Sequence, residues 1–190
     1  VGSMHTGKTS IVNRYVNGDF SLHTLTTTQP AFSQKNLTYK RREISLDIWD
    51  TAGQERYHAL SPLFYRDSEA GIVVFDITDL SSFQKANKWI GELKQARGDN
   101  VFIVLAGNKC DLEDKRVVDK ADAQKLAAKY NAPYFETSAL KNENIDSVFN
   151  SICNNIVERM PASSQNEPSK SLKSSIQFQD DEAKPKGNCC

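Results

Sequence analysis

The stretch GSMHTGKT, from Gly2 to Thr9, decides the fold of this chain. It fits the pattern GxxxxGK[ST], in which glycines let the backbone turn its N–H groups toward phosphate oxygens while the lysine reaches the β- and γ-phosphates. Apolar residues then recur at helical spacing from Lys8 to Val16, and Gly18 supplies a stop. The stretch therefore predicts a phosphate-binding loop that opens an α-helix, with the Thr9 hydroxyl as a magnesium ligand.

Strand and helix patterns alternate along the rest of the chain. Two extended stretches, Ala31–Tyr39 and Arg42–Trp49, are separated by a polar step that predicts a hairpin turn. Two later runs, Gly71–Ile77 and Val101–Ala106, are apolar on both faces, as parallel strands covered by helices must be. Helical periods lie between and after these runs. We expect an α/β fold with a doubly wound, mostly parallel sheet and flanking helices.

Composition sets the class of protein. The chain has 190 residues, with 24 basic and 24 acidic side chains, which suits one soluble domain with an appendage and implies no attraction to nucleic acid. Without an apolar run of 18 residues, no membrane-spanning helix is expected. The four cysteines show no zinc or disulfide pattern, which favours a reducing cytosol. Residues 161–190 are polar and predict a disordered tail after a domain spanning residues 1–160.

A second motif, DTAGQE, begins where the strand Arg42–Trp49 ends. Asp50 is placed to hold magnesium through water, and Gly53 offers a backbone N–H to the γ-phosphate. Gln54 is suited to orient an attacking water. The motif therefore predicts the hydrolytic part of the site, on the segment that follows the strand.

Two further motifs predict recognition of guanine. Asn108, Lys109 and Asp111 follow a buried strand, and ligands of such sheets bind beyond the carboxyl ends of the strands. An aspartate there can accept hydrogen bonds from the N1–H and the exocyclic amine of guanine, which adenine cannot supply. The motif TSA (137–139) follows in the order expected of the same pocket.

The four motifs resemble the Ras superfamily of small GTPases, from Val1 to about Arg159. The resemblance implies a six-stranded sheet with five helices, binding of GTP and GDP, and hydrolysis of GTP with Mg²⁺, for which Met4 predicts a slow intrinsic rate. It implies that Thr27 closes on magnesium and the γ-phosphate in switch I, and that Phe20 packs against guanine. The catalytic residues are then Gln54, Lys8, Thr27 and Gly53, and the metal ligands are Thr9, Thr27 and Asp50. The nucleotide-binding residues are Gly2, Ser3, Met4, His5, Thr6, Gly7, Lys8, Thr9, Ser10, Phe20, Thr27, Asp50, Gly53, Asn108, Lys109, Asp111, Ser138, Ala139 and Leu140.

Within the superfamily the chain resembles the Rab family, through the segments LDIW (46–49), FYRDS (64–68) and FDIT (75–78). The segments 26–32, 56–61 and 82–93 are most similar to the early-endosomal branch. Phe32, Trp49 and Phe64 match the aromatic triad that Rab proteins present to effectors between the switches; the alternative is that they belong to the ordinary core. The resemblance implies a monomer that regulates vesicular traffic on the cytoplasmic face of endosomal or other vesicle membranes and cycles with the cytosol. An exchange factor, a GTPase-activating protein, an escort protein and a GDP dissociation inhibitor would be its further partners.

The chain ends in Cys189-Cys190, which is not a CaaX box. Rab proteins that end in two cysteines carry geranylgeranyl groups on both, so the resemblance implies membrane anchoring through two lipids. Two unmodified thiols are the alternative, although exposed free cysteines are usually a liability.

The chain departs from the family pattern at several positions. The apolar strand that should precede Gly2 is absent, so the sequence is either a fragment, which we favour, or a fold that lacks a central strand and is less stable. Met4 and His5 replace small residues, and Pro30 replaces a residue with a free N–H. These changes leave two functional classes open: a cycling GTPase, and a hydrolysis-poor adaptor that binds GTP. An ATP-using enzyme is disfavoured by Asp111.

Overall fold

The phosphate-loop stretch forms the predicted loop and helix. In the computed structural model, which describes residues 1–22, 25–53 and 65–160, helix α1 spans Lys8–Asn17. Gly7 precedes it with φ 88° and Gly18 follows it with φ 75°, both in the left-handed region that glycine tolerates. Gln54, Phe64, Cys189, Cys190 and the tail predicted over residues 161–190 lie outside the described residues.

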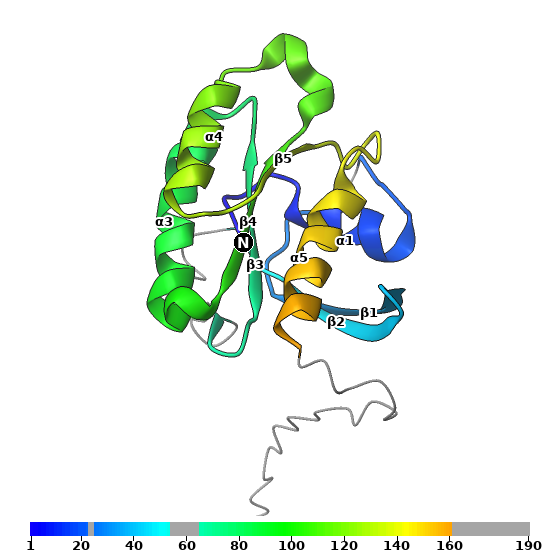
Figure 1. Cartoon of the computed structure of the whole chain (residues 1–190). Helices are drawn as coiled ribbons and strands as arrows, with labels where there is room; N and C mark the ends of the chain where they lie inside the picture. Colours follow the sequence, from blue (N-terminus) through cyan, green and yellow to red (C-terminus); the bar gives the residue numbers. More distant parts are fainter. Residues whose placement is uncertain (23–24, 54–64, 161–190) are drawn as a thin grey trace, which may run out of the picture.

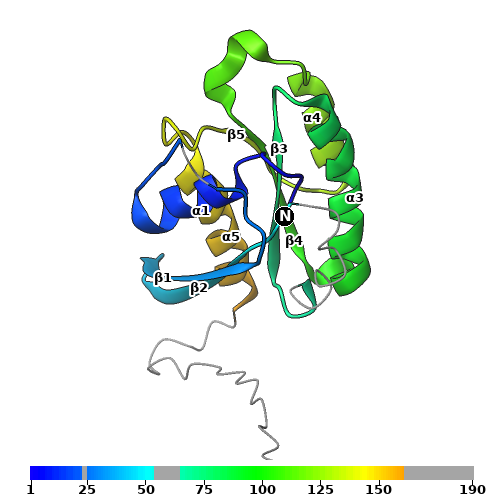
Figure 2. The same cartoon turned by 180° about the vertical axis from the view of Figure 1, so that it is seen from behind.

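A parallel sheet of three strands forms the middle of the molecule. Its strands β3 (Ala70–Asp76), β4 (Phe102–Asn108) and β5 (Tyr134–Thr137) are hydrogen-bonded in the order β3-β4-β5. Helices α3 (Leu80–Arg97) and α4 (Lys120–Lys129) cover one face. Helix α1 and helix α5 (Ile145–Arg159) cover the other, as Figures 1 and 2 show from opposite sides. The predicted doubly wound α/β fold is confirmed.

Alternation along the strands divides the core into two parts. Val73 and Phe75 of β3 pack on the side of α3, in a cluster with Ile90. Val74, between them in the sequence, faces the opposite side and packs in a cluster with Phe149 of α5. Each such buried side chain contributes about 1.5–3 kcal/mol of transfer free energy. Both faces of β3 are apolar because both are covered by helices.

Local signals explain where the helices begin. The carboxylate of Asp79 accepts from the backbone N–H of Ser81 at the start of α3, and Asp119 accepts from Ala121 at the start of α4. Two short 3₁₀ helices are also present, η2 (Gly98–Asn100) after α3 and η3 (Cys110–Lys115) after β4. Helix η3 therefore carries Asp111 directly away from the end of the central strand.

The predicted hairpin is present as β1 (Ala31–Tyr39) and β2 (Arg42–Asp50), paired antiparallel. Lys40 and Arg41 form its turn with φ values of 48° and 64°, which is the geometry of a two-residue turn between twisted strands. The pairing brings Ala31 opposite Asp50. The hairpin thus delivers Asp50 to the same end of the molecule as the phosphate loop.

The described strands form two sheets, of two and three strands, rather than the single six-stranded sheet that the family resemblance implies. In the part of the chain that the structure describes, β2 is paired with β1 only. The open edge of β3 is met by Val1: its N-terminal nitrogen donates to the Ile72 carbonyl at 2.8 Å, and its carbonyl accepts from Val74 N–H at 2.9 Å. Val1 therefore leads into the phosphate loop from the edge of the central sheet.

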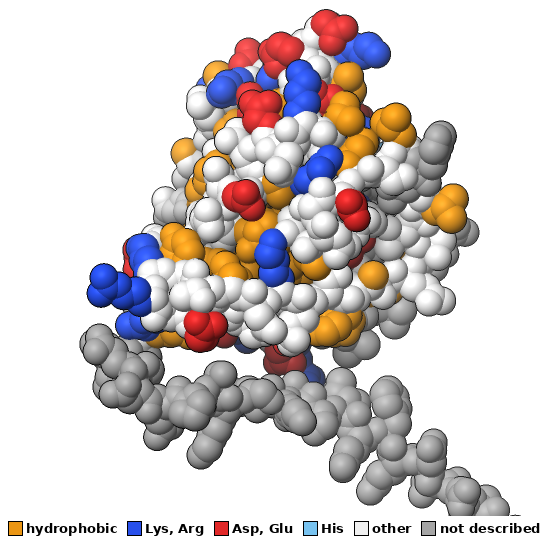
Figure 3. Space-filling view, turned by 90° about the vertical axis from the view of Figure 1, so that its right-hand side faces the viewer, with side chains coloured by type: hydrophobic (Ala, Val, Ile, Leu, Met, Phe, Trp, Pro, Cys, Tyr) orange, Lys and Arg blue, Asp and Glu red, His pale blue; other side chains and the backbone are white. Residues whose placement is uncertain are grey.

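The surface is mixed in charge. On the face that carries α1, α5 and the hairpin, Figure 3 shows acidic and basic side chains interspersed among polar and apolar ones. This agrees with the formal net charge of zero. Among the described helices, none is both long enough and apolar enough to cross a membrane.

Candidate nucleotide-binding site

The carboxyl ends of the parallel strands bring three of the sequence motifs together. Asn108, the last residue of β4, is buried, and its side-chain amide donates to the Thr6 carbonyl of the phosphate loop at 2.9 Å. Its amide oxygen accepts from the Thr137 hydroxyl at 3.1 Å. One side chain therefore joins the phosphate loop to the motif that ends β5. This arrangement is the one expected at the edge of an open α/β sheet.

The phosphate loop is shaped by glycines at two close approaches. A β-carbon on Gly2, whose φ is 141°, would overlap the Val74 carbonyl, and one on Gly7 would overlap the Asn108 amide. Inside the loop, the Ser3 carbonyl accepts from Lys8 Nζ at 2.8 Å and from the Thr6 hydroxyl at 2.9 Å. The lysine is thus already drawn across the loop toward the place where phosphates bind in this pattern.

The Lys8 ammonium is buried, and its environment is suited to an anion. Burial lowers its pKa to about 8, while the negative charge of Asp50 acts in the opposite direction. A buried cation with a lowered pKa is poorly solvated, so phosphate oxygens at this position would replace the missing water.

Three oxygen-bearing side chains meet next to Lys8. The Thr9 hydroxyl donates to Asp50 Oδ2 at 2.5 Å and lies 2.6 Å from the Thr27 hydroxyl. The other carboxylate oxygen of Asp50 is buried, and within the described residues it has no hydrogen-bond partner. Hydroxyl and carboxylate oxygens are the ligands that Mg²⁺ prefers, and an unpartnered buried oxygen needs a donor or a cation. The donor set therefore fits magnesium.

The base end of the site is built around Asp111. Ser138 donates its hydroxyl to Asp111 Oδ1 at 2.5 Å, and the Ser138 oxygen accepts from the Lys141 backbone N–H at 3.0 Å. Lys109, at φ 65°, turns its ammonium to Asp76 Oδ2 at 2.6 Å. The predicted residues of the NKCD and TSA motifs thus lie together, with the carboxylate of Asp111 held in one orientation.

Arg14 of α1 supports the loop that carries Ala139 and Leu140. Its Nε donates to the Ala139 carbonyl at 2.9 Å, and Nη2 donates to the Leu140 carbonyl at 3.3 Å. The same guanidinium lies 5.7 Å from the centre of the Phe20 ring. Phe20, Ala139 and Leu140 therefore all lie around the Arg14 guanidinium, although they come from distant parts of the chain.

Two residues of this site do not follow from the motifs. Asp76 pairs with Lys109, and its other oxygen accepts from the backbone and hydroxyl of Thr78 at 2.8 and 2.7 Å. It ends a buried parallel strand, which is a signal that could have found it. Arg14 lies on α1 without a motif of its own, and only the folded chain shows which carbonyls it reaches.

The remaining predicted residues lie in the phosphate loop, in the first turn of α1 or against the loop. Met4 and His5 are exposed, and His5 Nε2 lies 3.3 Å from the Thr26 hydroxyl, next to Thr27. Ser10 lies in the first turn of α1. Gly53 packs against Lys8 and Met4. Gln54, the predicted catalytic residue, lies outside the described residues.

The structure describes the exposure of two of the three predicted effector aromatics. Phe32 and Trp49 are opposite each other in the hairpin, with ring centroids 5.1 Å apart, and are 52% and 48% exposed. This exposure contradicts the core alternative for these two residues. Phe64 lies outside the described part of the chain.

Comparison with known proteins gives the family. Residues 1–158 match the model of the Ras family. The chain is 38% identical to Ras-related protein Rab-21 of Bos taurus, over all of this chain and 89% of that protein. It is 46% identical to Rab-21 of Dictyostelium discoideum, over 78% of this chain and 70% of that protein. It is also 40% identical to Ras-related protein RHN1 of Nicotiana plumbaginifolia, over 85% and 81%. The chain thus belongs to the Ras family and is a Rab-like small GTPase that binds and hydrolyses GTP and regulates membrane traffic.

Proposed function

We propose that this site selects guanine nucleotides through Asp111. The observation that carries the proposal is the short hydrogen bond from Ser138, which occupies one oxygen of Asp111 and restrains the carboxylate. Asn108 joins the phosphate loop and Thr137 to the same edge of the sheet, so base and phosphate subsites have a fixed separation. A carboxylate held this way is matched to the N1–H and amine of guanine, and a base without them would leave it unpaired.

In this proposal Thr9 and Thr27 would hold magnesium, and Asp50 would do so through water. The cation would supply positive charge that offsets the negative charge of the phosphates. Lys8 binds the β- and γ-phosphates, and Gly53 offers its N–H to the γ-phosphate. Gln54 orients the attacking water. The meeting of the Thr9, Thr27 and Asp50 oxygens supports these assignments.

The cellular role that we propose is a switch on endosomal or related vesicle membranes. The GTP form binds effectors through the exposed pair Phe32 and Trp49, together with Phe64. Geranylgeranyl groups on Cys189 and Cys190 hold it on the membrane, and two lipids give stable anchoring where one does not. An exchange factor, a GTPase-activating protein, an escort protein and a GDP dissociation inhibitor complete the cycle by family resemblance.

The second candidate function is a hydrolysis-poor adaptor that binds GTP, and it differs from the cycling switch in its rate of GTP hydrolysis. Met4 is exposed and its backbone touches Gly53, the residue before Gln54. This position favours a slow intrinsic rate, with effectors held for longer in the GTP form.

The exchange Asp111→Asn tests the base-reading role. An asparagine keeps an oxygen for the Ser138 hydroxyl and gains an N–H for the 2-oxo group of xanthine. We expect GTP affinity to fall roughly 10–100-fold, since a mismatched buried hydrogen bond costs ~1–3 kcal/mol, and XTP affinity to rise.

The matched control is Asp114→Asn, an exposed aspartate on the same helix η3, which should leave both affinities unchanged. Competition of GTP and XTP for a fluorescent nucleotide measures the preference. If Asp111→Asn kept the wild-type preference for GTP, the assignment of Asp111 would be wrong.

A further inference from the structure

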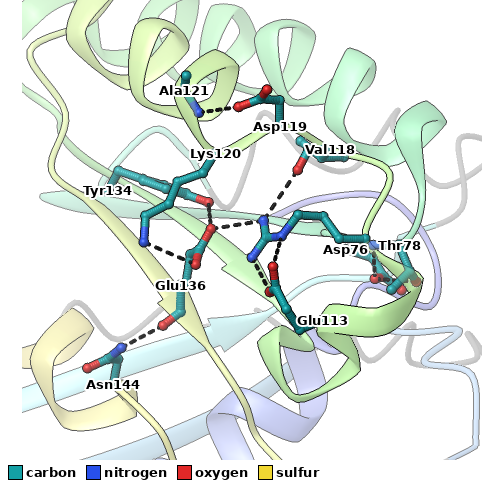
Figure 4. Close-up of polar contacts among 11 residues, drawn as sticks. Asp76, Thr78, Glu113, Val118, Asp119, Lys120, Ala121, Tyr134, Glu136 and Asn144 are labelled. Atoms are coloured by element: carbon teal, nitrogen blue, oxygen red, sulfur yellow. Dashed lines mark hydrogen bonds and ion pairs between the residues drawn. The ribbon is translucent and has the colours of Figure 1, made fainter.

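Arg116 connects the helix that carries Asp111 to strand β5. It directly follows η3, and its Nε and Nη2 donate to both carboxylate oxygens of Glu113, at 2.7 and 2.6 Å. Its Nη1 donates to Glu136 Oε1 of β5 at 3.0 Å (Figure 4). The side chains of Arg116 and Glu136 are only 17% and 15% exposed, whereas that of Glu113 is 67% exposed. The ion pair that is shielded from water is therefore Arg116–Glu136, which connects η3 to β5.

Glu136 has three further polar partners, from β5, from the start of α4 and from the residue before α5. Its Oε1 also accepts from the Tyr134 hydroxyl at 3.0 Å, and Lys120 at the start of α4 lies 3.4 Å from Oε2. Burial, together with the charge of Glu136, raises the pKa of Tyr134, so that hydroxyl remains a donor. The Glu136 carbonyl accepts from the Asn144 side chain at 2.7 Å. Figure 4 shows the side chains of Tyr134, Lys120 and Asn144 directed toward Glu136.

The two partners of this ion pair lie beside the two base-reading segments. Arg116 is the C-cap of η3, which carries Asp111, and Glu136 immediately precedes Thr137 and Ser138. Ser138 in turn bonds directly to Asp111. The segments are thus tied twice, once at the base-reading carboxylate and once behind it. A charge-assisted bond shielded from water is stronger than a neutral one, and losing one partner leaves the other charge without compensation.

We propose that the Arg116–Glu136 ion pair is a positioning device for guanine recognition: it fixes η3 against β5 so that the Asp111 carboxylate stays aligned with the base. This inference rests on the proposed base-reading role of Asp111. Arg116 and Glu136 act through Asp111 and Ser138 and do not touch the nucleotide.

A positioning role differs from simple stabilisation of the fold in one measurable way. GDP presents an N1–H and a 2-amino group, whereas IDP lacks the amine, so the ratio of their release rates reports the hydrogen bond from the amine to Asp111. A variant that only loosens the domain speeds the release of both nucleotides alike. A variant that misplaces Asp111 speeds the release of GDP more than that of IDP, and the GDP-to-IDP ratio of release rates rises.

The experiment measures release of labelled GDP and of labelled IDP from the wild-type full chain, Arg116→Gln and Glu136→Ala, each loaded with one nucleotide at a time. We expect GDP release to become about tenfold faster and IDP release to change by about twofold or less, within the range of coupling between linked groups. Chelation of Mg²⁺ should accelerate GDP release from these variants by the same factor as in the wild type. Arg116→Lys, which keeps the cation without the fork, should give an intermediate ratio. Arg116→Lys also replaces Arg116→Gln as the test variant if Arg116→Gln does not fold.

Glu113→Gln is the matched control, because it removes the exposed partner of Arg116 and leaves the pair with Glu136 in place. Its GDP-to-IDP ratio should stay at the wild-type value. If the wild-type protein does not distinguish GDP from IDP, the base-reading proposal itself fails. If the wild type distinguishes them and Arg116→Gln, Arg116→Lys and Glu136→Ala keep the full ratio, the positioning inference is overturned, whatever happens to their melting temperatures.

Discussion

Gly53 and Met4 are in such close contact that residue 53 can carry no side chain without moving the phosphate loop. A β-carbon on Gly53 would lie 2.6 Å from the Met4 nitrogen and 2.6 Å from Lys8 Nζ. Both atoms belong to the loop that holds the phosphates. The segment between Asp50 and Gln54 therefore reaches the phosphate loop only because it contains glycine at this point. Met4 therefore contacts the residue that precedes the predicted catalytic Gln54 in the sequence.

We expect Gly53→Ala to damage catalysis by this steric route. The added methyl group must displace either the loop backbone or the Lys8 ammonium, and misplacement of a catalytic group by about 1 Å can cost ~100-fold in rate. Single-turnover hydrolysis of bound GTP should fall by at least about tenfold.

Gly91→Ala in α3 is the matched control for Gly53→Ala, because nothing lies within 4 Å of its new β-carbon. Alanine inside a helix should raise the free energy of unfolding by about 0.5–1 kcal/mol and leave hydrolysis unchanged. A wild-type hydrolysis rate in Gly53→Ala would contradict this prediction, because it would mean that the loop accommodates the methyl group without disturbing catalysis.

The second prediction concerns Met4 itself. Its backbone lies against Gly53, the residue that precedes Gln54 in the sequence, so we expect its flexible thioether to crowd the glutamine as the water is aligned. Met4→Gly should therefore speed single-turnover hydrolysis, whereas Gln54→Leu should remove most of it. Mg²⁺-dependent nucleotide affinity should stay tight in both. An unchanged rate in Met4→Gly would mean that the side chain points away from the reaction, and the adaptor alternative would lose its main support.

The sequence predicted those parts of the fold that depend on local patterns. Helix α1 follows from the phosphate loop and Gly18, and the hairpin follows from alternation on both sides of Lys40-Arg41. Strands β3 and β4 agree with the apolar runs to within two residues, because both faces of these strands are buried. Asp50 also meets Thr9 as expected, since a strand end and a loop before a helix share one edge of the fold.

Contacts between distant segments could not be predicted in this way. Nothing in the order of residues shows that Arg14 reaches the Ala139 carbonyl or that Arg116 reaches Glu136, because long charged side chains have many possible partners. The division of the described strands into two sheets depends on pairing across the molecule, which periodicity does not encode. The roles of Gln54 and Phe64 remain predictions from motif and resemblance.

The third prediction tests the membrane anchor. Removal of both Cys189 and Cys190 should leave GTP affinity unchanged and move the protein fully to the cytosol, since a polar tail by itself has no membrane affinity. A single Cys190→Ser exchange should give partial recovery with membranes, because one lipid chain binds only marginally. Fractionation of cells that prenylate proteins, with nucleotide binding measured on the same samples, checks both. Full membrane recovery after deletion of both cysteines would rule out lipid anchoring at this site.

The last prediction concerns Asn108, which joins the phosphate loop to the TSA motif. Asn108→Ala leaves the Thr6 carbonyl and the Thr137 hydroxyl without their partner at a position that is only 2% exposed. Each buried group left unsatisfied costs about 1–3 kcal/mol, so the free energy of unfolding should fall by roughly 2–5 kcal/mol. Asn87→Ala is the matched control, because Asn87 also accepts two hydrogen bonds, from Lys129 and Tyr130, but does so at the surface. Its cost should stay within about 0.5 kcal/mol. Urea unfolding at saturating GDP, with GDP release measured in parallel, compares the two variants. Equal destabilisation by both, with wild-type GDP release from Asn108→Ala, would show that Asn108 does not hold the two segments together.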